Sequence, residues 1–172
     1  ARRQRQMCIR DRYRALKLDD YPGLQALQFA RWVPQADTER LLQEIRTDRS
    51  ITPQGYPQVQ LRPEGQRSHH LPVVYAEPIE TNTHLLGFDQ AADPVRRDVL
   101  ERARDAGRVL ASGPLQLVSG VRQARGFALR APVYDPSRPR DTLLQRRAAF
   151  LGQVGCAVEV AGMATRVMPA LS

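Results

Sequence analysis

Proline and glycine interrupt this chain so evenly that they divide it into short segments. The sequence holds 13 prolines and 11 glycines in 172 residues, spread along the chain rather than gathered in one linker. Proline ends or kinks a helix, and both residues mark turns. The spacing therefore favours many short elements joined by turns over a helix bundle. A chain of this length is long enough for one domain with a core of its own.

The hydrophobic pattern between these breaks predicts both strands and helices. Residues 47–70 are polar and rich in turn formers, so we expect irregular structure there. Strands outnumber helices, and three of them follow one another closely between residues 109 and 134. The predicted fold class is therefore α+β, an antiparallel sheet with flanking helices. The strands are expected at 24–33, 71–76, 109–111, 115–118, 126–134 and 150–160, and the helices at 37–46, 94–106, 141–149 and 161–168.

The clearest helix is expected between residues 94 and 106. Asp93 is a suitable N-cap, Pro94 suits the first helical position, and Gly107 is a C-terminal stop. The apolar stripe recurs at helical spacing, so we expect this helix to lie across the sheet. The residues expected to make that contact are Val95, Val99 and Ala103.

The positive charge of the chain is concentrated at its N-terminus. The net charge is +8, and residues 1–14 hold six arginines and one aspartate, which is five of those charges. Residues 6–12 resemble translated sequencing-adapter DNA, which favours a non-native tail, and a basic juxtamembrane arm is the alternative. We expect residues 1–14 to pack against nothing specific, and residues 15–172 to form the domain.

The sequence lacks the motifs of common metal, nucleotide-binding and catalytic sites. The histidines are His69, His70 and His84, and their spacing does not suit a metal site. The glycines form neither a GxGxxG motif nor a P-loop, and no serine lies in a G-x-S-x-G elbow. We therefore expect no catalytic residues, no metal and no cofactor.

Nucleic acid is not the expected partner either. Beyond the tail, basic and acidic residues alternate at i, i+3 and i, i+4 positions, as they do in 96–105. That pattern is typical of a solvated helix face. Aromatic residues make up 6% of the chain and are not interleaved with basic ones as base stacking would require.

Six segments, in order, resemble the CHASE family of sensor domains. The most specific is Leu86-Gly87-Phe88-Asp89, followed by Asp93-Pro94-Val95-Arg96 and Ala103-Arg104-Asp105-Ala106-Gly107. The others are the segments 21–40, 73–79, 111–117, 126–134 and 146–154. Together they extend over most of residues 21–168. Each motif is weak by itself, and their order makes the resemblance specific.

The resemblance implies a PAS-like α+β sensor on the extracytoplasmic (periplasmic) side of the cell membrane, between two transmembrane helices. Such domains feed histidine kinases, diguanylate cyclases or adenylate cyclases. No run of about 18 apolar residues is present, so we expect the chain to be a fragment without its membrane anchors. A homodimer is expected in the full-length receptor.

The resemblance also implies a small-molecule site. In plant cytokinin receptors of the family, an aspartate before the corresponding helix binds an adenine-type ligand, and Asp89 matches it, next to Phe88. Asp89 is expected at the rim of a pocket with its carboxylate free, although a turn-forming role remains open. The remaining residues expected to line the pocket are Ala111, Ser112, Phe127, Leu129 and Ala131.

Two other classes of function remain open from the sequence. One is a small soluble enzyme whose catalytic set is not recognisable, and the other is a protein-interaction domain. Transmembrane segments and a kinase or cyclase beside the domain would distinguish a receptor from both.

Overall fold

Many strands and helices, most of them under ten residues long, follow one another along the chain, as the spacing of prolines and glycines predicts. The computed structural model describes residues 21, 23–119 and 122–167; residues 1–14, expected to be a tail, lie outside these. The strands are β1 (Leu24–Arg31), β2 (Val33–Pro34), β3 (His69–His70), β4 (Val73–Glu77), β5 (Leu110–Ala111), β6 (Leu115–Ser119), β7 (Arg122–Tyr134) and β8 (Phe150–Glu159). The helices are α2 (Thr38–Arg46), α3 (Ile79–Asn82), α4 (Pro94–Ala106), α5 (Leu143–Ala149) and α6 (Val160–Val167), with 3₁₀ turns η2 (Gln35–Asp37) and η3 (Thr83–Leu85).

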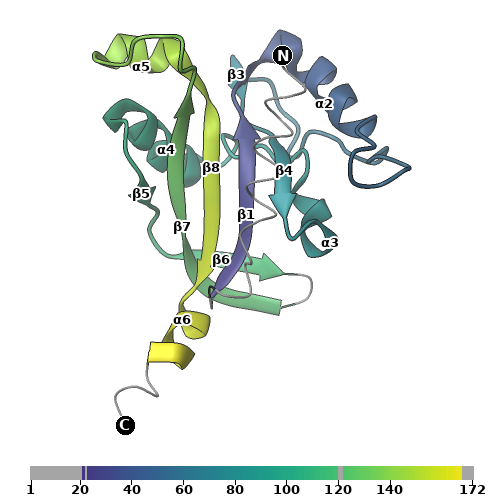
Figure 1. Cartoon of the computed structure of the whole chain (residues 1–172), viewed down its shortest axis with the longest axis vertical. Coiled ribbons are helices and arrows are strands. Elements are labelled where there is room, and N and C mark those ends of the chain that lie inside the picture. The colour runs from purple at the N-terminus through teal and green to yellow at the C-terminus, as the bar shows by residue number, and fades with distance from the viewer. Residues whose placement is uncertain (1–20, 22, 120–121, 168–172) are drawn as a thin grey trace.

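The strands form one main antiparallel sheet, as predicted. Its order is β4-β1-β8-β7-β5, and β6 also pairs with β7. Figure 1 shows β7 and β8 as its long central pair, with α4 and α5 on one side of them and α2 and α3 on the other. The predicted fold class is confirmed: this is an α+β sheet with flanking helices, consistent with a PAS-like sensor fold.

The two faces of the central strands are occupied differently. Successive side chains of a strand point to opposite faces, so Ala128 and Arg130 of β7 share one face, which we call the cavity face. The helix α4 packs against β7, and the Tyr134 hydroxyl, on the same face, donates a hydrogen bond to the Arg104 carbonyl of that helix. Phe127, Leu129 and Ala131 point to the opposite face, which we call the outer face.

The helix α4 has the bounds that the sequence predicts. The Asp93 carboxylate accepts a hydrogen bond from the Arg96 backbone N–H at 2.8 Å, and Gly107 ends the helix with φ 66°. Val99 and Ala103 are buried as expected. The expectation for Val95 is wrong, because its side chain is 60% exposed. Pro94 and Arg96, on either side of it in the first turn of α4, line the cavity instead.

The helix α5 begins two residues later than predicted. Thr142, rather than Asp141, caps it: the Gln145 N–H donates to the Thr142 hydroxyl at 3.2 Å, and the Gln145 side chain accepts from the Thr142 N–H at 3.0 Å. This reciprocal capping box satisfies two backbone donors. Aspartate can cap as well, so the choice between adjacent residues was not visible in the sequence.

An ionic contact joins α5 to α4. The Arg147 guanidinium donates to the Asp105 carboxylate at 2.6 and 3.0 Å, and Arg146 donates to the Asp105 carbonyl at 2.7 Å. The hydrogen bond from Arg147 is the main reason that the pKa of the Asp105 carboxyl is lowered to about 2. These bonds between charged groups connect α5 to the C-terminal end of α4.

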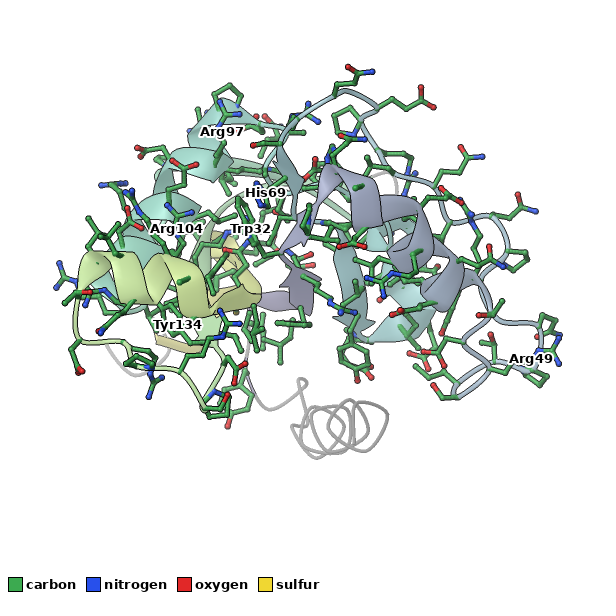
Figure 2. The ribbon with its side chains drawn as sticks, turned by 90° about the horizontal axis from the view of Figure 1, so that it is seen from above. Trp32, Arg49, His69, Arg97, Arg104 and Tyr134 are labelled. Carbon is green, nitrogen blue, oxygen red and sulfur yellow. The ribbon has the colours of Figure 1, made fainter. Side chains whose placement is uncertain are left out.

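An aromatic cluster closes the end of the sheet near α2 and α5. The Trp32 ring stacks on His69 with 4.8 Å between centroids and meets the edge of Phe150. The Arg104 guanidinium lies 5.9 Å from the Trp32 ring, and Figure 2 shows Trp32, His69 and Arg104 gathered between the helices. Cation–π contact and stacking fix α4 against this end of the sheet.

Candidate functional site

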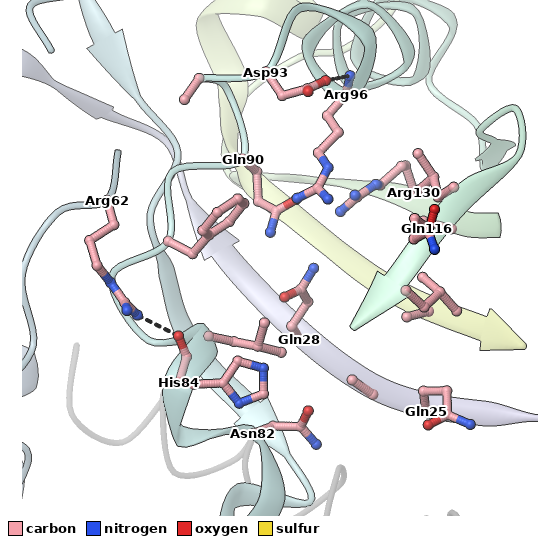
Figure 3. A pocket seen from close by; sticks show the side chains of 18 of the residues that line it. Gln25, Gln28, Arg62, Asn82, His84, Gln90, Asp93, Arg96, Gln116 and Arg130 are labelled. Atoms are coloured by element: carbon pink, nitrogen blue, oxygen red, sulfur yellow. Dashed lines mark hydrogen bonds between the residues drawn. The ribbon is translucent and has the colours of Figure 1, made fainter. Parts of the chain in front are cut away.

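A cavity of about 870 Å³ lies over the cavity face of the sheet. Its walls are β6, the segment 82–96 that leads into α4, and the Arg62–Pro63 loop. Figure 3 shows side chains from these elements converging on one space. Cavities of roughly 300–1,000 Å³ are typical of small-molecule sites.

Small residues on the three central strands leave this space open. Two rows of neighbouring residues run across the sheet and form the floor. From β1 through β8 to β7, they are Ala26–Ala157–Ala128 and Gln28–Gly155–Arg130. A Cβ atom at position 155 would lie 2.8 Å from Arg130 Nη1 and 3.1 Å from Gln28 Nε2. Glycine at this position therefore makes room for the two polar side chains beside it.

Apolar side chains form the walls. Leu115 and Leu117 line the cavity from β6, and Leu85, Phe88 and Pro94 line it from the segment opposite. An apolar body with a few polar groups is the usual composition of a ligand site, since apolar burial supplies affinity and polar groups supply orientation.

The polar group that stands out is the Arg130 guanidinium. Arg130 is 3% exposed, and its Nη1 has no hydrogen-bond partner. Burial, and next the like charge of Arg96, lowers the pKa of Arg130 to about 10. The guanidinium thus keeps its charge at neutral pH in a site where that charge is disfavoured.

Arg96 brings a second cation to the same end of the cavity. It belongs to the first turn of α4, and its guanidinium lies 5.1 Å from the centroid of the Phe88 ring. Figure 3 shows the Arg96 and Arg130 side chains pointing toward one another. The amides of Gln28 and Gln90 are their uncharged neighbours, each with a buried Oε1 that has no partner.

Asp89 occupies a different place from the one predicted. It is fully buried, and its carboxylate accepts from the backbone N–H groups of Leu71 at 2.9 Å and Ala91 at 3.0 Å. The other oxygen lies 2.7 Å from His70 Nδ1 and 3.3 Å from Arg67 Nη1. The predicted position at a pocket rim with a free carboxylate is therefore wrong. Asp89 fixes the turn that carries Phe88 and Gln90 into the cavity, which agrees with the alternative turn-forming role.

Of the other predicted pocket residues, Phe88 lines the cavity. The side chains of Phe127, Leu129 and Ala131 lie on the outer face, where Leu129 is 36% exposed. The strand was predicted correctly, but its neighbours in sequence, Ala128 and Arg130, provide the lining. Successive side chains of a strand point to opposite faces. Because the prediction assigned the wrong face of β7 to the pocket, every residue it named on that strand lies outside the lining.

Ala111 and Ser112 lie outside the lining as well. Ser112 joins the end of β5 to β7: its N–H donates to the Ala128 carbonyl at 2.8 Å, and its hydroxyl accepts from the Ala128 N–H at 2.9 Å. These bonds fix the position of Ala128, which lines the cavity. The expectation that Ala111 and Ser112 line the pocket is therefore wrong, and Ser112 contributes only by holding Ala128 in place.

The sequence patterns did not predict Arg130, Arg96 or the glutamines as residues of the site. One signal for Arg130 was available: a single arginine interrupts the apolar run Ala128–Val133 of a central strand. A charged residue in such a run is rarely buried unless it is paired. The glutamines gave no signal, because nothing local distinguishes a buried amide from a solvated one.

The described residues hold no group of three or more His, Cys, Asp or Glu side chains that could bind a metal ion. His84 lines the cavity, whereas His69 and His70 take part in packing and in the Asp89 network. Within the same part of the chain, no helix is long and apolar enough to cross a membrane.

Comparison with known families shows the family of this chain. The profile of the CHASE domain matches residues 10–170, nearly the whole chain. The chain belongs to the CHASE family. This match confirms the resemblance seen in the ordered motifs. CHASE domains are sensor domains of membrane receptors and are not catalytic.

A relative of this CHASE domain is a plant signalling protein. Probable histidine kinase 4 of Oryza sativa subsp. japonica is 29% identical over 111 residues, which are 64% of this chain. The aligned part covers 10% of the length of the rice protein. Together the two comparisons make this chain the sensor domain of a signalling receptor.

Proposed function

We propose that this CHASE domain binds a small molecule in the 870 Å³ cavity and passes the bound state to a cytoplasmic kinase or cyclase. The observation that carries the proposal is the cavity itself, with an alanine and glycine floor and converging polar groups. A packed core has few voids larger than a water molecule. A space of this size, lined by six separate parts of the chain, favours a ligand site over loose packing.

The last strand offers a route from the cavity to the end of the domain. Glu159, at the end of β8, lines the cavity, and α6 begins at the next residue. The Glu159 N–H donates to the Gly23 carbonyl at 2.7 Å, and this hydrogen bond connects the end of β8 to the residue before β1. A ligand that contacts this end of the cavity would bias the position of α6.

Ligand-observed NMR with a fragment set tests the binding step. The set contains equal numbers of organic acids, amines and neutral heteroaromatic compounds. We expect some fragments to bind the wild-type chain and to lose binding in Ala128→Leu, which fills the floor of the cavity. Ala131→Leu, on the outer face of the same strand, is the matched control and should bind as the wild type does. The proposal fails if no fragment binds, or if the two variants behave alike.

We also propose that the domain lies on the extracytoplasmic side of a cell membrane, between two transmembrane helices, in a homodimeric receptor that does not bind nucleic acid. The family membership and the rice histidine kinase support this placement. The flanking gene sequence tests it: apolar segments of about 20 residues on both sides are expected, followed by kinase or cyclase motifs. A gene that encodes the domain without such segments would contradict the placement.

A further inference from the structure

We propose that the cavity recognises a small organic acid, whose carboxylate binds between Arg130 and Arg96. This inference rests on the proposed function, since it names the chemical class of the ligand in the same cavity. It differs from the ligand class that the resemblance implies, which is an adenine-type base held by the carboxylate of Asp89.

The buried charge of Arg130 is the first step of the argument. Buried charged side chains are normally paired, because an isolated ion in a protein interior is strongly disfavoured. Arg130 has no ion-pair partner among the described residues, and its neighbours Gln28 and Gln90 are neutral amides. An amide oxygen can accept a hydrogen bond from the guanidinium but cannot neutralise it. The site thus lacks one negative charge.

Arg96 adds a second positive charge that requires a negative charge in the ligand. Two guanidinium groups that approach each other repel, and an anion between them removes the repulsion. Arg96 could turn into solvent, yet its side chain lies over Phe88 and points into the cavity (Figure 3). Arginine offers a planar pair of N–H donors that matches the two oxygens of a carboxylate.

The acids that line the cavity do not supply the missing charge. The Asp93 carboxylate is occupied by the N-cap of α4. Glu159 accepts a hydrogen bond from Gln25 Nε2 at 2.5 Å, and it lies four residues along β8 from Gly155, the neighbour of Arg130. At about 3.3 Å per residue, that is roughly 13 Å along the strand, too far for an ion pair.

The other residues that line the cavity indicate the shape and the polar groups of the rest of the ligand. Ala26, Ala128 and Ala157 form a flat apolar floor, and Phe88 offers a ring from the opposite wall. The Oε1 atoms of Gln28 and Gln90 have no partner and can each accept a hydrogen bond from a ligand donor. We therefore infer an acid with a flat apolar body and at least one N–H or O–H donor.

The Asp89 carboxylate is not available to an adenine-type base. Both oxygens of Asp89 are engaged by protein donors, and the side chain is fully buried behind the turn it stabilises. The cations of the cavity face the ligand, so the complementary group carries negative charge.

Matched pairs of compounds test this inference on the full 172-residue chain. The probes are benzoate and indole-3-carboxylate, each with its primary amide, together with phenyl phosphate and adenine. Affinities are measured by calorimetry or ligand-observed NMR at one ionic strength. We expect the carboxylates to bind at least tenfold more tightly than the amides. Tighter binding of phenyl phosphate than of both carboxylates would overturn the choice of a carboxylate.

Three variants locate the charge that recognises the acid. Losing a hydrogen bond to a charged group typically weakens binding about ten- to a hundredfold, so we expect that loss for carboxylates in Arg130→Gln and a comparable one in Arg96→Gln. Binding of the amides should change little in both. Arg102→Gln, an exposed position on α4 paired with Asp98, is the control and should leave every affinity unchanged.

The outcomes separate this inference from the proposed function. If amides or adenine bind in the cavity as well as the acids do, or if Arg130→Gln binds acids like the wild type, the cavity is a ligand site but not for an acid. If none of the probes and no fragment of the wider set binds, the proposed function itself fails. Arg96 is partly exposed, so its variant remains informative even if Arg130→Gln misfolds.

Discussion

At the scale of single residues, two buried charges have opposite roles in this CHASE domain. Asp89 is surrounded by donors and holds a turn, whereas Arg130 is buried without an opposite charge. A buried charge with all its partners supports the fold, and one without partners opposes it. Stability that is given up at one position commonly marks a functional site.

Removing the charge of Arg130 should stabilise the unliganded chain. The folded-state pKa of about 10 lies below the usual value for arginine, so the penalty is fully present below pH 10 and disappears as pH rises above it. We expect Arg130→Met to raise the free energy of unfolding by roughly 1–3 kcal/mol at pH 7. Urea unfolding followed by circular dichroism measures this, with Arg108→Met, at an exposed position, as the control. A less stable Arg130→Met would show that the guanidinium has partners that stabilise the fold.

Asp89→Asn should have the opposite effect. The amide keeps one acceptor but loses the charge that faces His70 and Arg67, and breaking a buried ionic network costs about 3 kcal/mol. Asp93→Asn is the matched control and should be nearly neutral, since asparagine caps a helix as well as aspartate does. The same urea experiment applies. Unchanged stability in Asp89→Asn, with the wild-type fold, would mean that the carboxylate does not hold the turn.

At the scale of elements, charge joins α4 to α5. Asp105 is the shared group, with Arg147 on α5 and Arg104 on α4 as its partners. Caps and turns fix each short helix separately, and their bounds were predicted to within two residues from local sequence. Their contact depends on residues 42 positions apart, which no local pattern indicates.

The Asp105 contact should be lost in acid. Its folded-state pKa of about 2 lies below the usual 3.8, so the stabilisation is complete above pH 4 and disappears as pH falls from about 4 to 2. At pH 7 we expect Asp105→Asn to lower the free energy of unfolding by roughly 1 kcal/mol, because the pair is partly exposed. Wild type and variant should converge near pH 2 in thermal melts. Asp141→Asn, at an exposed position, should match the wild type throughout, and an Asp105→Asn deficit that persists at pH 2 would point to lost packing instead.

At the scale of the whole molecule, the cavity lies where β1, β7 and β8 meet the segment that leads into α4. Binding there contacts the end of β8, from which α6 continues. We expect the most strongly binding carboxylate to slow amide hydrogen exchange in the last residues of β8 and in α6. Exchange in α2, which does not line the cavity, should be unchanged. Equal protection of both helices would indicate general stabilisation rather than a route to the end of the domain.

The sequence by itself determined most of the strands, the caps of α4, the fold class and the family; it did not predict β3 or the first four residues of β7. These features depend on local backbone preferences, on hydrophobic patterns with strand or helix periodicity, and on the order of motifs. All three are properties of the linear sequence. It did not determine the site. The tertiary structure decided that Ala128 and Arg130, rather than Phe127, Leu129 and Ala131, face the cavity, and that Asp89 turns inward to His70. Which face of a strand is enclosed depends on which elements pack against it, and a shift of one residue exchanges every side chain between the two faces.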